Sequence, residues 1–381
     1  MSTPDCRYQE ALELCHREGR FRTPLPIRHQ GAGRILLEGQ SLLNLCSNDY
    51  LGLQGEKWLW HKFLEEEAAN YLPSASSSRL LSGNDEIYTR FEAELSQLYH
   101  KPSALLWESG FHANSGALPV LALPSTLFLV DRLAHASIID GVRASGAPFH
   151  RFRHNDLGHL RTLLERYSEQ YQTIWVVTES LFSMDGDFAP LKDIIGLKRL
   201  YPHLLVYLDE AHAMGVCGEE GLGYASQIEM LEGVDLFVGT FGKALASVGA
   251  FTLQSEALKG LLTSEARPFI FSTALPPINV AWTRYLFTAQ RAMAERRAKL
   301  RGLQSLFGEL SHRTIASPII PVIVPGEEAV QAKAKQLQKA GFFVRPIRKP
   351  TVPEGQERIR ISLTAALTPD EIKHIVAVIN A

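Results

Sequence analysis

Val238-Gly239-Thr240-Phe241-Gly242-Lys243-Ala244-Leu245 closes the last of a series of short apolar strands in this 381-residue chain. The turn is built from small residues and presents one lysine. Packed backbone around such a turn can strip water from the lysine, and desolvation lowers the pKa of an amine. A neutral amine is what Schiff-base formation with an aldehyde requires. Because a single lysine is most often a solvated surface residue, the segments upstream decide between the two interpretations.

Upstream of this turn, apolar strands alternate with helical segments from about residue 104 onward. The expected strands are 104–107, 127–130, 174–178, 204–208 and 236–238, and the expected helices are 112–122, 136–144, 156–168 and 191–200. Almost continuously apolar strands separated by helices predict a mostly parallel sheet covered on both faces. The fold class is therefore α/β.

Polar and ionisable residues follow these strands directly. They occupy 108–112, 131–135, 179–185, 209–212 and 240–243. Ligands of open α/β sheets bind beyond the carboxyl ends of the strands, where these segments meet. The sequence predicts one functional site at that edge.

Further segments precede and follow the sheet. A helix (about 4–18) and a hairpin (35–37 with 42–45) come first, and a long helical pattern (about 278–310) leads into strands near 319–324, 342–346 and 358–363. The last helix opens with a capping box, 368–371, with proline at its first position. We therefore expect an N-terminal helix and hairpin segment (1–46), a large domain (47–283) and a small C-terminal α/β domain (284–381).

The composition is that of a globular protein, with 45% hydrophobic and 21% charged residues. A net charge of −2 does not favour nucleic acid as a partner. The first residues lack the apolar block of a signal peptide, and the most apolar run, 117–130, is too short to span a bilayer. The four cysteines form no C-x-x-C pair. We expect a cytoplasmic protein with a small-molecule substrate, no membrane contact and no metal.

Asp209 and Lys243 form a candidate functional pair at neighbouring strand ends. A buried aspartate needs a cationic or hydrogen-bonding partner, and a protonated pyridine nitrogen is one. In pyridoxal-phosphate enzymes this pairing keeps the ring cationic, so that it can accept the electron pair released at the substrate α carbon. Lys243 would supply the amine that holds the cofactor.

Other residues at this edge suit the remaining parts of that cofactor. Gly110-Phe111-His112 begins a helix, where backbone N–H groups and the positive dipole end bind phosphate. Thr240 adds a hydroxyl, His135 can lie flat on an aromatic ring, and His212 can reach a ring hydroxyl. Each histidine alone is more often structural, and only their shared edge favours a functional role.

Asp209-Glu210-Ala211-His212 also matches the D-E-A-H box of NTPases. That class needs a phosphate loop of the form G-x-x-x-x-G-K-[ST]. At the Gly242-Lys243 step, Phe237 replaces the first glycine and Ala244 replaces the hydroxyl residue. A DEAH-type NTPase is therefore disfavoured.

Six ordered motifs resemble the alpha-oxoamine synthases. They are Ser47–Gly52, Ser109–Phe111, Asp131–Ser137, Phe182–Asp187, Asp209–His212 and Thr240–Ala244. The resemblance spans nearly the whole chain. It implies a fold type I pyridoxal-phosphate enzyme that works as a homodimer with its active site at the subunit interface.

The resemblance assigns roles by position. Lys243 matches the Schiff-base lysine, Asp209 the partner of the pyridinium nitrogen and His135 the ring-stacking residue. The other matches to cofactor-binding residues are Gly110, Phe111, Ser183, His212 and Thr240, together with Ser272 and Thr273 of the partner subunit. Asn48 and Arg360 match groups that hold the amino-acid carboxylate, a task that suits the planar fork of arginine. Separately from the resemblance, Arg20, Arg22 and Arg345 form a candidate patch for contact with an acidic acyl carrier protein, and a solvated basic face explains these residues equally well.

Two features favour those members of the family that condense L-alanine with a pimeloyl thioester in biotin biosynthesis. One is the segment 347–353 running into 358–364, and the other is an N-terminus without a targeting extension. Members of the aminoketobutyrate ligase, aminolevulinate synthase and serine palmitoyltransferase types, which use glycine or serine, stay open. So do the carrier, coenzyme A or acyl carrier protein, and the acyl chain length. One departure from the family pattern is Ser74-Ala75-Ser76-Ser77-Ser78-Arg79 in place of G-x-G-x-S-R, because serine and alanine resist the left-handed backbone that glycine adopts.

Overall fold

The computed structural model describes residues 4–381, which form two compact units. The larger unit comprises residues 48–183 and 187–299. The smaller unit comprises the N-terminal residues up to Ser47, the short segment 184–186 and residues 300–381. Residues 4–46 of the segment expected as a separate N-terminal piece group with the C-terminal part, because strand β3 (Gln40–Asn44) pairs with β12 (Phe342–Phe343).

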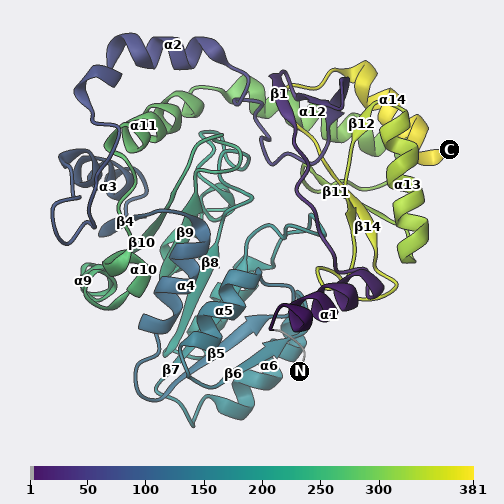
Figure 1. Cartoon of the computed structure of the whole chain (residues 1–381). Helices are drawn as coiled ribbons and strands as arrows, with labels where there is room; N and C mark the ends of the chain where they lie inside the picture. The colour runs from purple at the N-terminus through teal and green to yellow at the C-terminus, as the bar shows by residue number, and fades with distance from the viewer. Residues whose placement is uncertain (1–3) are drawn as a thin grey trace. The chain divides into compact units, whose positions relative to one another are not determined.

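The larger unit is built on a seven-stranded sheet with the order β4-β10-β9-β8-β7-β5-β6 (Figure 1). Its strands are β4 (Ser103–Trp107), β5 (Thr126–Asp131), β6 (Phe149–Phe152), β7 (Thr173–Glu179), β8 (Leu204–Asp209), β9 (Leu236–Thr240) and β10 (Ala250–Gln254). Only β10 runs antiparallel to its neighbours, β4 and β9. The mostly parallel α/β sheet is therefore confirmed, and the carboxyl ends of six strands lie at one edge.

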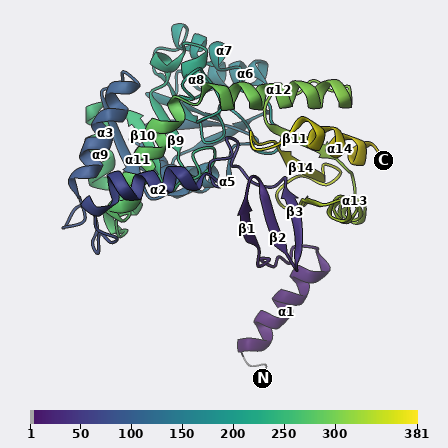
Figure 2. The ribbon, with the colours of Figure 1, turned by 90° about the horizontal axis from the view of Figure 1, so that it is seen from above.

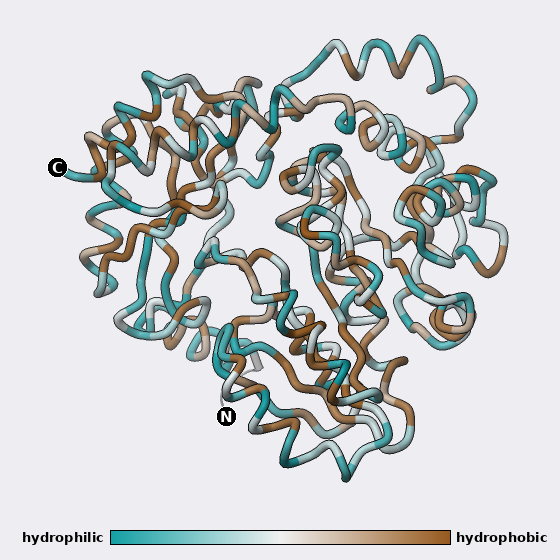
Figure 3. The backbone as a smooth tube through the Cα atoms, turned by 180° about the vertical axis from the view of Figure 1, so that it is seen from behind, coloured by the Kyte–Doolittle hydropathy of each residue, from teal (hydrophilic) through white to brown (hydrophobic). Residues whose placement is uncertain are grey.

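Both faces of this sheet are buried, which explains why its strands are apolar at nearly every position. In β8, Leu204, Val206 and Leu208 join one core, while Tyr207 joins the core on the opposite face. The strands of this sheet accordingly appear as brown segments in the hydropathy tracing of Figure 3. Apolar side chains on both faces require a helical layer on each side.

The two helical layers come from different parts of the larger unit. Helices α4 (Gly110–Val120), α5 (Ala136–Ala144), α9 (Glu256–Glu265) and α10 (Arg267–Phe271) cover one face, and α3 (Glu86–Leu98), α6 (Leu157–Tyr167), α7 (Leu191–Gly196) and α11 (Pro277–Arg291) cover the other. The remaining elements of the unit are α2 (Lys57–Glu66), α8 (Tyr224–Gln227) and the 3-10 turns 68–70, 197–199 and 231–233. Helix α12 (Ala294–Ser311) spans the division between the units at residue 299.

The smaller unit contains two small sheets. The first has the order β1-β2-β3-β12, and its strands β1 (Arg28–Gly31), β2 (Arg34–Leu37) and β3 lie side by side beyond α1 (Pro4–Arg17) in Figure 2. The second is antiparallel, with the order β11-β14-β13, and consists of β11 (Ile319–Ile323), β13 (Pro346–Ile347) and β14 (Arg358–Ser362). Helices α13 (Glu327–Lys339) and α14 (Pro369–Asn380) complete it. The predicted capping box of α14 is confirmed, with reciprocal hydrogen bonds between Thr368 and Glu371.

No helix in residues 4–381 is long and apolar enough to cross a membrane.

Candidate active site

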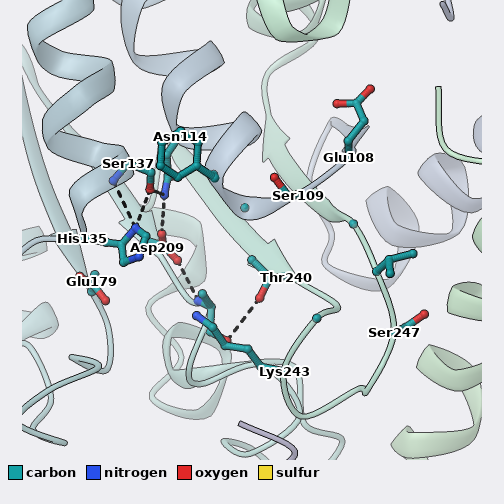
Figure 4. A pocket seen from close by; sticks show the side chains of 16 residues that line it. Glu108, Ser109, Asn114, His135, Ser137, Glu179, Asp209, Thr240, Lys243 and Ser247 are labelled. Atoms are coloured by element: carbon teal, nitrogen blue, oxygen red, sulfur yellow. Dashed lines mark hydrogen bonds between the residues drawn. The ribbon is translucent and has the colours of Figure 1, made fainter. Parts of the chain in front are cut away.

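A cavity of about 360 Å³ opens at the carboxyl edge of the larger sheet. Its walls come from residues that follow β4, β5, β8 and β9, as expected for a parallel sheet. Figure 4 shows these side chains converging from separate strands. Six of the predicted cofactor residues line it: Gly110, Phe111, His135, Asp209, Thr240 and Lys243.

Lys243 lies on the turn after β9, between two buried anchors. Phe241 and Leu245 are almost fully buried, and the Phe241 N–H donates to the carbonyl of Gly249 at 3.0 Å. The Ala246 N–H donates to the carbonyl of Lys243 at 2.8 Å, which closes the turn. Apolar packing on both sides therefore fixes the backbone that carries the lysine, and its half-buried side chain lines the cavity.

Asp209 ends β8 and is 4% exposed. Its Oδ1 accepts the N–H of Ala211 at 2.8 Å, and its Oδ2 accepts the Asn114 amide at 2.8 Å. The two donors, one on each oxygen, fix the plane of the carboxylate. Asp209 therefore reaches the cavity as an oriented acceptor that can pair with a cationic ring nitrogen.

His135 caps the N-terminus of α5 and also lines the cavity. Burial lowers the pKa of His135 below its ordinary value; Asp209 opposes this shift, and the positive charge of Lys243 reinforces it. The imidazole is therefore neutral near pH 7. A neutral, flat ring beside the lysine and the aspartate suits stacking on an aromatic cofactor.

The N-terminus of α4 supplies an anion site at the same cavity. The Ser109 side chain accepts the N–H of His112, while the Ala113 N–H donates to the carbonyl of Ser109. The N–H groups of Gly110 and Phe111 precede the first intrahelical hydrogen bond. A Cβ at Gly110 would lie 2.6 Å from Cγ2 of Thr240, so glycine permits this close approach.

The residues present therefore fit pyridoxal phosphate. An amine, a carboxylate and a helix N-terminus surround one cavity, matching the aldehyde, ring nitrogen and phosphate of the cofactor. Glu179, the neighbour of Asp209 across β7 and β8, also lines it, and its buried Oε1 has no hydrogen-bond partner among residues 4–381. Burial raises the pKa of Glu179 well above its ordinary value, and Asp209 acts in the same direction.

The remaining cofactor candidates in the larger unit do not line this cavity. His212 is buried, and its Nδ1 lies 2.7 Å from the Tyr50 hydroxyl, which also donates to Oδ1 of Asn48 at 3.2 Å. Asn48 and His212 are thus joined through one tyrosine. Ser183 belongs to the loop after β7, and Ser272 and Thr273 follow α10.

The three arginine candidates belong to the smaller unit. Arg360 lies in β14, is 8% exposed and donates to Oγ of Ser362 at 2.7 Å. Arg20 is exposed and pairs with Glu18 at 2.6 Å. Arg22 is exposed and donates to Oγ1 of Thr351 at 3.1 Å. Their roles in substrate binding stay predictions.

Reasoning from the sequence missed three buried polar residues around the cavity: Asn114, Ser137 and Tyr207. Asn114 and Ser137 lie inside helices and Tyr207 lies inside a strand. The prediction considered only the residues that follow each strand, so it did not include these three. The sequence does contain a signal for Asn114, because it is a polar residue between the apolar and small residues of α4. A polar residue facing a buried sheet needs hydrogen-bond partners.

Glu210 does not behave as the second acidic residue of a D-E-A-H box. It is fully buried, and its two carboxylate oxygens accept the backbone N–H groups of Tyr224 and Ala225 at 2.8 and 2.7 Å. It does not line the cavity. This glutamate fixes the loop that leads into α8 and is not positioned to serve a nucleotide.

Comparisons with known proteins agree with the geometry. The family model for aminotransferase class I and II matches residues 40–379. A protein of Neisseria meningitidis serogroup A, named "Putative 8-amino-7-oxononanoate synthase", is 46% identical over 377 residues, which are 97% of this chain and 99% of that protein.

Solved structures show the same relationship. One described as "High resolution structure of SPT with PLP internal aldimine" has a TM-score of 0.89 at 25% identity, covering 99% of this chain and 98% of that one. The 8-amino-7-oxononanoate synthase of Francisella tularensis has a TM-score of 0.74 at 26% identity, covering 89% and 96%. The chain therefore belongs to the aminotransferase class I and II family and is a pyridoxal-phosphate-dependent enzyme of the alpha-oxoamine synthase type.

Proposed function

We propose that this enzyme condenses L-alanine with a pimeloyl thioester to give 8-amino-7-oxononanoate, a step of biotin biosynthesis. The observation that carries the proposal is the 46% identity, over almost the full length of both chains, to a protein named "Putative 8-amino-7-oxononanoate synthase". The cavity supports it with an amine, an oriented carboxylate and an anion site in one place.

Each predicted site residue has a role in this reaction. The cofactor, when bound, supplies an electron sink that stabilises negative charge at the substrate α carbon. Lys243 holds the cofactor, and Asp209 keeps the ring nitrogen protonated while His135 stacks on the ring. The N-terminus of α4, with Thr240, binds the phosphate.

Lys243 also moves the proton. With alanine bound, the free amine of Lys243 would take the proton from the α carbon of alanine. A carbon–carbon bond then forms between that α carbon and the thioester carbonyl carbon, and the carrier thiol leaves. The bond to the alanine carboxyl group breaks, carbon dioxide leaves, and a proton returns to the same carbon.

The remaining assignments complete the proposal. Asn48 and Arg360 hold the alanine carboxylate, and Ser183 and His212 contact the ring oxygen. The enzyme works in the cytoplasm as a homodimer with a shared active site, in which Ser272 and Thr273 of the partner subunit contact the phosphate. Arg20 and Arg22 offer positive charge to an acidic acyl carrier protein.

The first test is a visible spectrum of the purified enzyme with pyridoxal phosphate, titrated separately with L-alanine, glycine and L-serine. A spectral response chiefly to alanine, with 8-amino-7-oxononanoate formed from pimeloyl-coenzyme A or the pimeloyl carrier protein, is expected. Because one similar structure is described as SPT, serine with a long-chain acyl thioester is the informative comparison. A response chiefly to serine or glycine would contradict the proposed substrate and keep the enzyme class.

Lys243→Ala tests the role of the lysine in the same assay. We expect the visible band to be lost and turnover to fall by about 10³-fold or more, because both the covalent anchor and the base are removed. Lys192→Ala, at an exposed position on α7, is the matched control and should leave both unchanged. A Lys243→Ala enzyme that keeps the band and turns over would show the assignment to be wrong.

A further inference from the structure

We propose that Asn114 is a positioning residue that couples the orientation of Asp209 to that of His135 through a branched hydrogen-bond network with Tyr207 and Ser137. The inference rests on the proposed pairing of Asp209 with the ring nitrogen of the cofactor. It does not depend on which amino acid or acyl thioester the enzyme uses.

Asn114 is 1% exposed, and both its amide nitrogen and its amide oxygen have hydrogen-bond partners. Its Nδ2 donates to Oδ2 of Asp209 at 2.8 Å and to Oγ of Ser137 at 2.9 Å. Its Oδ1 accepts from the Tyr207 hydroxyl at 2.7 Å. Figure 4 shows Asn114 reaching toward Asp209 and Ser137 from α4.

The chemistry of the partners fixes which way the amide faces. An ionised carboxylate only accepts hydrogen bonds, so the amide nitrogen must point at Asp209. Tyr207 must then donate to the amide oxygen. Burial, together with the nearby Asp209 charge, raises the pKa of Tyr207 well above its ordinary value, so the phenol keeps the proton it donates.

The second branch of the network fixes His135. Ser137 is fully buried, and its hydroxyl lies 2.7 Å from Nδ1 of His135, while the Ser137 N–H also donates to this nitrogen at 3.3 Å. A nitrogen that accepts a backbone N–H carries no proton itself, so the Ser137 hydroxyl donates to it as well. The histidine is therefore the neutral tautomer with its proton on Nε2.

One amide consequently controls two groups that flank the cavity. Asp209 takes one hydrogen bond on each oxygen, from Asn114 and from the N–H of Ala211 at 2.8 Å, which fixes the plane of its carboxylate. Without Asn114 the carboxylate would keep the Ala211 bond alone and could rotate away from the cavity. The buried Ser137 hydroxyl would also lose its donor, which loosens His135.

The test uses the full-length protein and measures cofactor binding rather than turnover. Apo-enzyme of Asn114→Ala, Asn114→Asp, Tyr207→Phe and the parent is titrated with pyridoxal phosphate, and the pH midpoint of the visible band is then determined. Ser115→Ala is the matched control, because Ser115 follows Asn114 on α4 and donates to the backbone carbonyl of Phe111. Thermal unfolding of each apo-protein separates folding from positioning.

Asn114→Ala is expected to weaken cofactor binding about tenfold or more, since hydrogen bonds to charged groups are among the stronger ones. Asn114→Asp keeps the shape, places a second carboxylate against Asp209 and should weaken binding further. We expect the pH midpoint of the visible band to rise in both variants. When the cofactor ring carries less positive charge, the nitrogen that links the cofactor to Lys243 holds its proton more tightly. Tyr207→Phe should shift both quantities in the same direction by a smaller amount.

The inference is overturned if Asn114→Ala melts like the parent and matches its cofactor affinity and pH midpoint. If Asn114→Ala does not fold, an unchanged affinity and midpoint in Tyr207→Phe overturns it instead. The proposed function fails separately: a parent enzyme that binds the cofactor but does not respond to alanine contradicts the substrate and leaves the role of Asn114 intact.

Discussion

Gly110 is the residue at which side-chain size should matter most for the anion site. A Cβ built there would meet Cγ2 of Thr240 at 2.6 Å, and the β-branched Thr240 side chain, 7% exposed, has little freedom to move. We expect Gly110→Ala to lower the free energy of unfolding by about 1–3 kcal/mol and to weaken cofactor affinity several-fold. Denaturant unfolding and cofactor titration measure the two effects.

Two further variants test the cause of that effect. Thr240→Ser removes the clashing methyl group, so Gly110→Ala combined with Thr240→Ser should recover part of the lost affinity. Gly260→Ala is the control, because nothing lies within 4 Å of a Cβ at that position in α9. It should be neutral or stabilising by up to about 1 kcal/mol. A double variant as weak as Gly110→Ala alone would argue against a steric cause.

At the level of single residues, position relative to the strands decided what the sequence could predict. Lys243, Asp209 and His135 were found because each lies at or just after the end of a strand, and they meet at one cavity. Asn114 and Tyr207 were missed because their roles depend on a hydrogen bond between a helix and a strand that no local pattern encodes.

The loop Ser74–Arg79, where serine and alanine replace glycine, contains one residue in the left-handed region of the backbone. This residue is Ser76, with φ of +53°, and its N–H donates to the Ser74 hydroxyl.

At the level of elements, the capping box of α14 offers a clean stability test. The side chain of Thr368 accepts the N–H of Glu371 at 3.2 Å, and the Thr368 N–H donates to the Glu371 carboxylate at 2.9 Å. Thr368→Ala should lower the free energy of unfolding by about 1 kcal/mol, because the first turn loses its side-chain acceptor. Amide hydrogen exchange along α14 should quicken. Thr368→Ser keeps the acceptor and should behave like the parent; equal losses in both variants would argue against the cap.

Five of the seven strands of the larger sheet were predictable from their apolar sequence, and two were missed. The expected strands 104–107, 127–130, 174–178, 204–208 and 236–238 match β4, β5, β7, β8 and β9. β6 was missed because its residues, Phe149-His-Arg-Phe152, include exposed and half-buried polar positions. β10 was missed, although it is buried throughout, because residues 241–249, which connect it to β9, contain no helix.

The expected long helix, 278–310, is two helices, α11 and α12. No proline or glycine lies between α11 and α12. A side-chain contact ends α11 instead of a helix-breaking residue. Arg297, 1% exposed, donates to the carbonyls of Gln290 and Arg291 at 2.8 Å each and so satisfies the end of α11. Here a side chain of one helix caps the end of the helix before it. Such a contact does not alter the spacing of apolar residues, so the sequence pattern continues through the break.

At the scale of the whole molecule, an ionic network around the buried Asp131 joins segments of the larger unit that are distant in the sequence. His154, after β6, lies 2.9 Å from Asp131 at the end of β5 and 2.9 Å from Asp187 in the loop after β7. Burial opposes the charged imidazolium, but hydrogen bonds to Asp131 and Asp187 outweigh it and raise the pKa of His154 to about 10. Asp131 is fully buried, so the positive charge compensates a carboxylate with no access to water.

This network predicts how stability depends on pH. The unfolded histidine titrates near pH 6.5, whereas the folded one keeps its proton to about pH 10. Between these values the folded state binds the extra proton, so the contribution of His154 to the free energy of unfolding is fully present below about pH 6.5 and is lost as pH rises through about 10. Denaturant unfolding from pH 6 to 10 measures this decline.

His154→Gln isolates this contribution, because glutamine keeps a hydrogen-bond donor but cannot titrate. We expect the variant to be less stable than the parent at pH 6 and the difference to shrink toward pH 10. His61→Gln, at an exposed position on α2, should follow the parent at every pH. Glu210 also titrates within this range: burial raises its pKa from 4.5 to about 7, so the stability of the parent and of the variants falls alike as pH rises to about 7 and stays lowered above it. A parent–variant difference that stays constant from pH 6 to 10 would mean that His154 is neutral in the folded protein.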